Sequence, residues 1–150
     1  MPKHFKSRVA GLKHGWRSGL EEAVGEQIKK AGIKAQYEEL RIPFSQPEKV
    51  RHYTPDWILP NGIVIETKGR FITADRQKHL LVKAAHPDLD VRFVFSNSKS
   101  RISKKSQTTY RMWCETKGFR YADRLIPPHW FREPANRASL AVLAFLRTLK

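Results

Sequence analysis

The spacing of apolar residues after the first 17 positions predicts a helix. Leu20 and the apolar residues that follow recur at intervals of three and four, up to Ala31. Ser18 and Glu21 match the capping box, in which the serine caps the helix and the glutamate reaches back to the cap. Gly32 is a natural stop for this helix. The sequence therefore predicts a helix that begins at Ser18 and ends before Gly32.

The next 37 residues have the pattern of extended chain. Residues 33–42 read as extended, although the alternation is imperfect around Glu38 and Glu39. Residues 43–52 hold two prolines and several polar side chains, which predicts an extended connector that does not pack. Two apolar runs follow within residues 53–69 and are joined by Pro-Asn-Gly at positions 60–62, which predicts a hairpin whose second strand ends at Gly69.

The second half of the chain alternates helical and strand patterns. A helix is predicted over residues 73–85, capped by Thr73, and a buried strand over residues 91–95. A basic loop rich in hydroxyl groups follows, then a helix from residue 108 or 109 to Gly118 and a last helix near residues 134–149. The residues expected to face inward on the first of these helices are Ala74, Gln77, Leu80, Leu81 and Ala84. This pattern predicts an α/β fold with a mixed central sheet flanked by helices.

Composition places this chain among ordinary globular domains. It has 150 residues, of which 40% are hydrophobic, and this length suits a single domain. No segment approaches the roughly 20 apolar residues that a membrane span needs. The basic N-terminus has no apolar run after it, so it is not expected to be a secretory signal. Cys114 is the single cysteine, so no intrachain disulfide can form, and a reducing cytoplasm is expected.

Charge indicates the kind of partner. The chain has 29 Lys and Arg residues against 14 Asp and Glu residues, a formal net charge of +15. Such an excess favours a polyanionic partner, most often nucleic acid, although a solvated basic surface or a ribosome-associated protein has the same composition. Residues 1–16 read as a basic flexible arm, either in contact with phosphate or without a role.

The hairpin at residues 53–69 carries the candidate chemistry. Asp56 lies on its first run, and Glu66 and Lys68 lie two apart on its second. Residues i and i+2 of a strand share a face, and the hairpin brings Asp56 towards them. Two carboxylates and an ammonium group suit a divalent cation and a phosphodiester, as in a nuclease. The competing interpretation is an ordinary charged hairpin with a cross-strand ion pair.

Each residue of this group has an expected role. Asp56 and Glu66 are predicted metal ligands, with the backbone carbonyl of Thr67 as a further ligand, for Mg²⁺ or its substitute Mn²⁺, with one or two ions per site. Lys68 is expected to orient or help deprotonate the attacking water, or to neutralise charge developing on the phosphate. Glu21 begins a helix and is either a fourth catalytic residue or only the capping partner of Ser18.

The motif resembles a known nuclease signature. Pro55-Asp56 followed by Glu66-Thr67-Lys68 looks like the PD-(D/E)xK pattern. At a finer level, the chain is similar to the phage endonuclease I family of Holliday junction resolvases over about residues 16–133. The matching segments are residues 17–21, 53–56, 59–63, 66–69, 78–81, 94–96, 114–115 and 122–127. The extreme N-terminus and the apolar last helix lie outside this resemblance.

The resemblance implies a fold and an activity. It implies a PD-(D/E)xK nuclease domain over residues 17–133 that cleaves four-way and other branched DNA with a divalent metal, in a phage-infected or prophage-bearing cell. It makes Glu21 a catalytic residue. It also implies an intertwined homodimer that exchanges elements through residues 44–52, so that Glu21 of one chain joins Asp56, Glu66 and Lys68 of the other. The helix at residues 134–150 has no implied role. Candidate DNA contacts are Arg17, Ser18, Arg51, Arg70, Arg76 and Lys99.

Two other functions fit parts of the sequence. A PD-(D/E)xK nuclease of restriction, repair or transposition type would cut linear duplex, which a comparison of junction with duplex cleavage distinguishes. A non-catalytic DNA-architectural protein would use only the basic surface, and replacing Glu66 with alanine would leave it unaffected. The grouping of Asp56, Glu66 and Lys68 argues against this second alternative.

Overall fold

A computed structural model describes residues 18–46 and 49–149. The predicted basic arm and the candidate DNA contact Arg17 lie outside these residues. The helices are α2 (Gly19–Lys30), α3 (Thr73–Ala85), α4 (Tyr110–Lys117), α5 (Pro128–Phe131) and α6 (Arg137–Arg147). The strands are β1 (Gln36–Tyr37), β2 (Ile42–Gln46), β3 (Lys49–Tyr53), β4 (Trp57–Ile58), β5 (Ile63–Lys68), β6 (Asp90–Phe95) and β7 (Arg120–Asp123).

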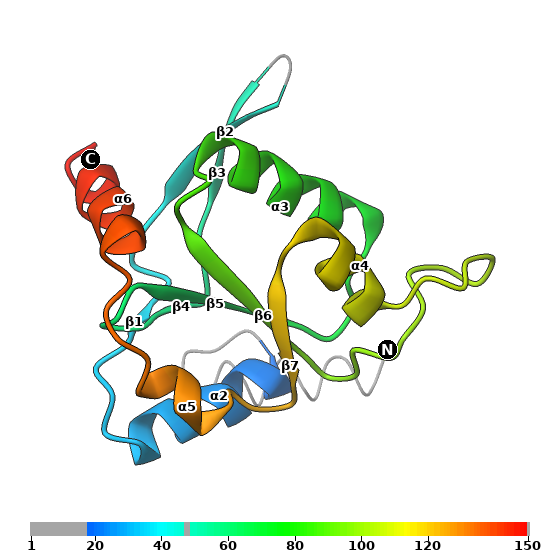
Figure 1. Ribbon diagram of the computed structural model, residues 1–150, viewed down its shortest axis with the longest axis horizontal. Helices are drawn as coiled ribbons and strands as arrows, with labels where there is room; N and C mark the ends of the chain where they lie inside the picture. Colours follow the sequence, from blue (N-terminus) through cyan, green and yellow to red (C-terminus); the bar gives the residue numbers. More distant parts are fainter. Residues whose placement is uncertain (1–17, 47–48, 150) are drawn as a thin grey trace.

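A mixed sheet lies at the centre of the fold (Figure 1). Its five strands follow the order β1-β4-β5-β6-β7. β4 is antiparallel to both β1 and β5, whereas β5, β6 and β7 are parallel to one another. The parallel pairs require crossover connections, which α3 and α4 supply. The predicted α/β class and mixed central sheet are therefore confirmed, and β5 is the middle strand.

Helices cover both faces of the sheet (Figure 1). Val64 of β5 belongs to a hydrophobic core that also contains Val82 of α3 and residues of α4 and α6. Its neighbours Ile63 and Ile65 belong to a second core with Val24 of α2 and residues of α5. A strand buried on both faces reads as a continuous apolar run, which is the pattern of residues 63–65. The alternation along β5 thus places Glu66 and Lys68 on the α3 side of the sheet.

The helix ends follow the capping signals. The hydroxyl of Ser18 accepts a hydrogen bond from the Glu21 backbone N–H at 3.1 Å, and Gly32 has a φ of 68° just beyond the end of α2. Thr109 caps α4 by accepting from the Met112 N–H at 3.3 Å, and Gly118 ends α4 with a φ of 78°. The predicted starts and stops of these two helices are confirmed.

Residues 43–46 and 49–52 lie in the two strands of a hairpin, so the prediction of an unpacked connector is wrong for these residues of the single chain. β2 pairs with β3 in antiparallel register, with Phe44 opposite Arg51. Ile42 and Phe44 are buried in the first core, on the side of α3. Proline suggested a break, but both strands of a two-stranded sheet are edges, where Pro43 needs no N–H to donate.

Helix α3 has the predicted bounds but buries a different face. Its buried residues are Arg76, His79 and Val82. Of the residues expected to face inward, Leu80 and Leu81 are half-buried, whereas Ala74, Gln77 and Ala84 are exposed. Thr73 is the first helical residue and not the cap, which is Ile72. The helix was predicted correctly, but the side of it that faces the core was not, because a histidine and an arginine occupy core positions.

The last helix is shorter than predicted and packs on the sheet. Asn136 caps α6 by accepting from the Ser139 N–H at 3.1 Å, and Leu143 and Leu146 enter the first core. Gly62 in the β4–β5 turn has a φ of 93°, and a Cβ there would lie 3.1 Å from the carbonyl oxygen of Asn136. The Pro-Asn-Gly turn and α6 are therefore packed against each other. Among residues 18–46 and 49–149, no helix is long and apolar enough to cross a membrane.

Candidate active site

The predicted site residues meet at the carboxyl end of the middle strand. Glu66 and Lys68 end β5, and Asp56 immediately precedes β4. The Lys68 ammonium nitrogen lies 3.5 Å from Oε1 of Glu66, as the i, i+2 spacing predicts. Asp56 and Glu66 are 1% and 3% exposed. Ionisable carboxylic acids are rarely this deeply buried, so this end of the sheet is an unusual acidic position in a basic protein.

Asp56 is fixed by the strand beside it. Its Oδ2 accepts hydrogen bonds from the Thr67 backbone N–H at 2.9 Å and from the Thr67 hydroxyl at 2.7 Å. Two donors on one oxygen define the orientation of this carboxylate. Lys68 instead forms its ion pairs with Glu66 and with Asp75 of α3, both at 3.5 Å. The hairpin is therefore not held by a simple cross-strand ion pair of Asp56 with Lys68.

Glu21 comes to the same place from helix α2. Its side chain is 5% exposed, and its Oε2 accepts a hydrogen bond from the Tyr37 hydroxyl at 2.5 Å. Carboxylate oxygens of Glu21, Glu38 and Asp56 all lie within 4.8 Å of one another. The structure thus brings the side chains of Glu21 and Asp56 together within one chain.

Glu38 is a candidate residue that the sequence analysis missed. It follows β1 with a φ of 48°, a left-handed conformation that is uncommon for residues other than glycine. Its backbone N–H donates to the Asp56 carbonyl oxygen at 3.2 Å, which holds it beside the site. The one signal in the sequence was the broken alternation at Glu38 and Glu39, which marks the bend but not its chemistry.

The donor set suits a hard divalent cation. Glu21, Glu38 and Asp56 offer only oxygen atoms, which Mg²⁺ and Mn²⁺ prefer over nitrogen or sulfur. Glu21 and Asp56 are buried and Glu38 is half-buried, so water screens charge weakly here and a cation would interact strongly with the three side chains. Glu66 is not one of these three residues, but it is near enough for the charge of Asp56 to act on it. These residues therefore can hold a metal ion.

The surroundings of Glu66 likewise disfavour its negative charge. Burial, and next the charge of Asp56, raise the pKa of Glu66 to about 8, although Lys68 acts in the opposite direction. The Tyr53 hydroxyl donates to Glu66 Oε2 at 2.5 Å. Burial lowers the pKa of Lys68, but Glu66 and Asp75 outweigh it, so the pKa lies above its ordinary value and Lys68 is an ammonium ion at neutral pH. This charge state favours neutralisation or orientation over proton abstraction by Lys68.

The candidate DNA contacts fall into two groups. Arg51, Arg70 and Lys99 are exposed, whereas Ser18 is half-buried and caps α2. Arg76 is 8% exposed, and its guanidinium donates to the Phe71 carbonyl and, at 3.0 Å, to the Thr73 hydroxyl. These bonds give Arg76 a structural role at the start of α3.

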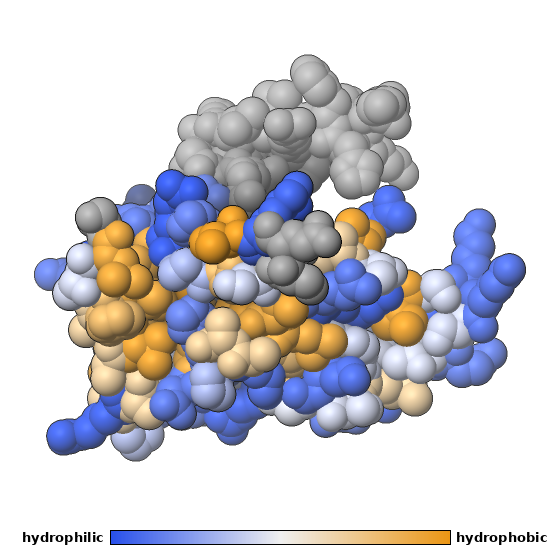
Figure 2. Space-filling view, turned by 90° about the horizontal axis from the view of Figure 1, so that it is seen from above, coloured by the Kyte–Doolittle hydropathy of each residue, from blue (hydrophilic) through white to orange (hydrophobic). Residues whose placement is uncertain are grey.

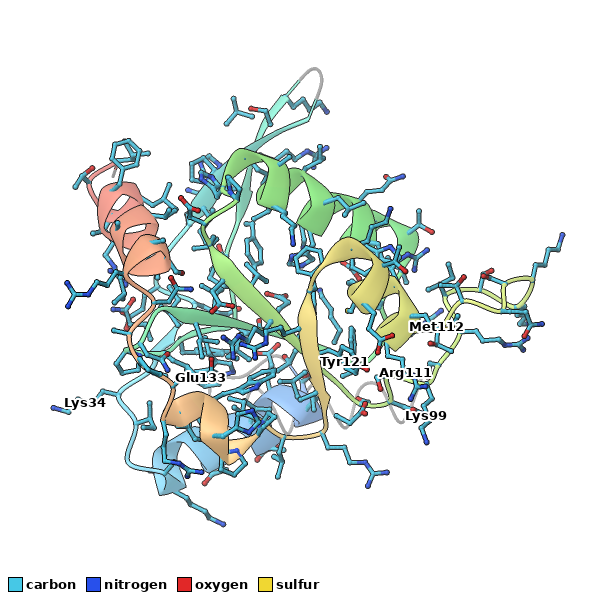
Figure 3. The ribbon with its side chains drawn as sticks, viewed as in Figure 1. Lys34, Lys99, Arg111, Met112, Tyr121 and Glu133 are labelled. Atoms are coloured by element: carbon cyan, nitrogen blue, oxygen red, sulfur yellow. The ribbon has the colours of Figure 1, made fainter. Side chains whose placement is uncertain are left out.

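The loop that carries Lys99 begins beside the site. The N–H of Ser96, its first residue, donates to the Lys68 carbonyl at 3.2 Å. Lys99 and Arg111 are neighbours on this side of the molecule (Figure 3), because the Arg111 N–H donates to the Ser98 carbonyl at 2.9 Å. Lys99 and Arg111 are therefore two exposed cations on the segment whose first residue is bonded to the end of β5.

Cys114 takes no part in this site. It belongs to the first core and is 0% exposed, and burial raises the pKa of its thiol to about 12. A thiol this reluctant to ionise is a packing residue, which agrees with the absence of an activating base near it in the sequence.

Comparisons with known proteins give the family. The family model described as Phage endonuclease I matches residues 1–150. Endonuclease I of Escherichia phage T7 is 49% identical over 119 residues, which cover 79% of this chain and 80% of that protein. Endodeoxyribonuclease 1 of Enterobacteria phage T3 is 52% identical over 119 residues, covering 79% of this chain and 78% of that protein. The chain therefore belongs to the phage endonuclease I family and is an endonuclease, a hydrolase of phosphodiester bonds.

Proposed function

We propose that this endonuclease is a metal-dependent endodeoxyribonuclease that resolves four-way junctions and other branched DNA by paired nicks near the branch point. The observation that carries the proposal is the convergence of Asp56, Glu66 and Lys68 at the carboxyl end of β5. Family membership, and the naming of one relative as an endodeoxyribonuclease, support DNA as the substrate.

The site residues divide the chemistry between them. Asp56, Glu66 and the Thr67 carbonyl would hold Mg²⁺ or Mn²⁺, one or two ions per site, with Glu21 and Glu38 beside Asp56. The metal supplies a hydroxide-generating and phosphate-binding centre when it is bound. Lys68, held as an ammonium ion between Glu66 and Asp75, stabilises negative charge that develops on the phosphate.

Positive charge over the rest of the surface binds the arms of the junction. With a formal net charge of +15, the protein attracts phosphate without reading base sequence. Exposed Arg51, Arg70 and Lys99 are proposed phosphate contacts, whereas Arg76 is excluded because its guanidinium is buried and bonded. Selection of branched DNA then follows from the placement of two such surfaces.

We further propose that the protein is a homodimer, because a nearly two-fold junction needs two matched nicks. Large apolar side chains remain exposed on β3 and on and after α6: Val50 is 71% exposed, Phe145 62% and Leu149 55%. Figure 2 views the molecule from above and shows hydrophobic residues in orange on the left, the side where Figure 1 places α6. Exposed apolar groups of this size favour a protein interface.

Exchange of elements between two chains is compatible with the hairpin. Glu21 precedes β2 and β3 in the chain, and Asp56 follows them. If the hairpin opens, the contacts that Glu21 makes with Asp56 can form between chains. Refolding a mixture of Glu21→Ala and Glu66→Ala chains tests this exchange. In an exchanged heterodimer one site regains both residues and nicks one strand, whereas without exchange each site lacks one residue and the mixture is inactive.

The substrate is tested with an immobile four-way junction beside its linear arms, in Mg²⁺ or EDTA. We expect paired nicks near the branch with wild type and Mg²⁺, and none with EDTA or Glu66→Ala. Equal cutting of the linear arms would instead indicate a nuclease of the restriction, repair or transposition type. Tight binding without cutting in Mg²⁺ or Mn²⁺ would leave only an architectural role. We expect the enzyme to act in the cytoplasm of a phage-infected or prophage-bearing bacterium.

A further inference from the structure

We propose that Tyr53 is a positioning residue that sets the orientation of the Glu66 carboxylate for metal binding. The inference rests on the proposed function, in which Glu66 is a metal ligand. Tyr53 touches neither the metal nor DNA in this proposal. It acts by holding one oxygen of the Glu66 carboxylate, so that the other oxygen is oriented for metal binding.

The two oxygens of Glu66 have different partners. Oε2 accepts the hydrogen bond of the Tyr53 hydroxyl at 2.5 Å, whereas Oε1 is the atom that lies 3.5 Å from the Lys68 ammonium nitrogen. A carboxylate turns readily about its last torsion, because that torsion is broad and roughly two-fold. A short hydrogen bond to one oxygen removes this freedom, in the manner of the outer-shell partners that orient metal ligands.

Tyr53 is itself held firmly. It is the last residue of β3, is 2% exposed and belongs to the first core. Its ring packs edge-on against His79, with 4.9 Å between ring centroids, and the ammonium nitrogen of Lys78 lies 5.6 Å from the Tyr53 centroid. A hydroxyl on a ring packed in this way has little room to move.

His79 contributes packing and not a hydrogen bond. Its ring is 1% exposed and also packs edge-on against Phe93 at 4.8 Å. Among the described residues, neither ring nitrogen of His79 has a hydrogen-bond partner. Burial lowers the pKa of His79 well below its ordinary value, so the ring is neutral. The Tyr53 hydroxyl therefore directs its bond to Glu66 without competition from this neighbour.

The first glutamate of the site has a matching arrangement. Tyr37 donates to Glu21 Oε2 at 2.5 Å, and its ring packs against Trp57 at 4.5 Å. Tyr37 precedes the β2–β3 hairpin and Tyr53 ends it. The part of the site that precedes the hairpin thus carries the pair Tyr37–Glu21, and the part that ends or follows it carries the pair Tyr53–Glu66. These two parts are the halves that two chains could exchange. This pairing keeps both carboxylates oriented whether the halves come from one chain or from two.

The test is Tyr53→Phe, which removes only the hydroxyl. Its matched control is Tyr121→Phe, because the Tyr121 hydroxyl donates to Glu115 Oε1 at 2.7 Å on the exposed surface between β7 and α4. Calorimetry without DNA measures the dissociation constant for Mn²⁺. We expect about 10-fold weaker binding in Tyr53→Phe, the usual size of an outer-shell effect, and no change in Tyr121→Phe.

A second readout separates positioning from a general loss of structure. The rate of junction cleavage is measured against metal concentration. We expect Tyr53→Phe to need more metal for half-maximal rate and to approach the wild-type rate at saturation. In a Glu66→Gln background, Tyr53→Phe should weaken Mn²⁺ binding no further, because the residue acts through Glu66.

Each contrary result has its own meaning. Mn²⁺ binding by Tyr53→Phe at the wild-type affinity would overturn the inference, and so would a Tyr53→Phe chain that fails to fold, since the hydroxyl would then serve the fold. Equal losses in Tyr53→Phe and Tyr121→Phe would also overturn it. If Glu66→Ala binds Mn²⁺ like the wild type, the metal role of Glu66 fails first, and the proposed mechanism fails with it.

Discussion

Thr67 holds Asp56 with two hydrogen bonds to the same oxygen: its backbone N–H lies 2.9 Å and its hydroxyl 2.7 Å from Oδ2 of Asp56. The residue lies between Glu66 and Lys68, on the opposite face of β5. One strand end therefore supplies a carboxylate, an ammonium group and the support for a second carboxylate. Thr67, the middle residue of the Glu-x-Lys motif, thus has a role of its own, which is to hold Asp56.

Replacing Thr67 with valine should slow catalysis. The substitution keeps the shape and the backbone donor but removes the hydroxyl, leaving a buried acceptor with one donor fewer. Such a loss costs on the order of 1–3 kcal/mol, and a roughly 10-fold lower rate of junction cleavage is expected. Thr67→Ser keeps the hydroxyl and should retain most of the activity. A Thr67→Val enzyme as fast as wild type would show that Asp56 needs only the backbone bond.

Glu38 provides a prediction with a natural control next to it. Its carboxylate lies with those of Glu21 and Asp56, whereas Glu39 is exposed and lies outside that group. Glu38→Gln removes one negative charge from the acidic group and should weaken Mn²⁺ binding several-fold. Glu39→Gln removes the same charge from the surface and should not. Calorimetry on the two variants compares them directly, and equal affinities would remove Glu38 from the site.

The hairpin and its chemistry were predictable because the signals are local. Pro60, Asn61 and Gly62 mark a turn, and the i, i+2 spacing places Glu66 beside Lys68 whatever the rest of the chain does. The capping signals at Ser18 and Thr109 are equally local. Geometry that depends only on nearby residues can be predicted from a single sequence.

The missed features depend on partners far along the chain. Glu38 reaches the site because its N–H bonds to Asp56, and His79 occupies a core position because Tyr53 and Phe93 form a pocket for its ring. Neither contact has a spacing that a single sequence reveals. The β2–β3 hairpin was missed because proline outweighed the alternation of Ile42 and Phe44, which the structure buries on one side.

Glu66 should make the metal-free protein less stable as pH rises. Burial and Asp56 raise the pKa of Glu66 to about 8, above the ordinary value of 4.5. A raised carboxyl pKa contributes stability that is complete below the ordinary pKa and is lost as pH rises through the folded pKa. In EDTA, the midpoint of thermal unfolding of Glu66→Gln should therefore exceed that of wild type by an amount that grows between about pH 4.5 and 8.

The same comparison has a surface control. Glu39→Gln changes an exposed carboxylate and should follow the wild-type dependence on pH. Added Mn²⁺ should narrow the difference between wild type and Glu66→Gln, because the ion stabilises ionised Glu66 and binds the folded state. A difference that does not change with pH would mean that Glu66 ionises normally in the folded protein.

The most direct test of the proposed activity is cleavage of a supercoiled plasmid that extrudes a cruciform. A resolvase with two coupled sites cuts both strands at the branch within one encounter. Wild type with Mg²⁺ should therefore yield linear plasmid cut at the inverted repeat, with little nicked circle, and Glu66→Ala should leave the plasmid supercoiled. Cutting that is equally fast in a plasmid without the inverted repeat, or that falls at sites away from it, would contradict the account.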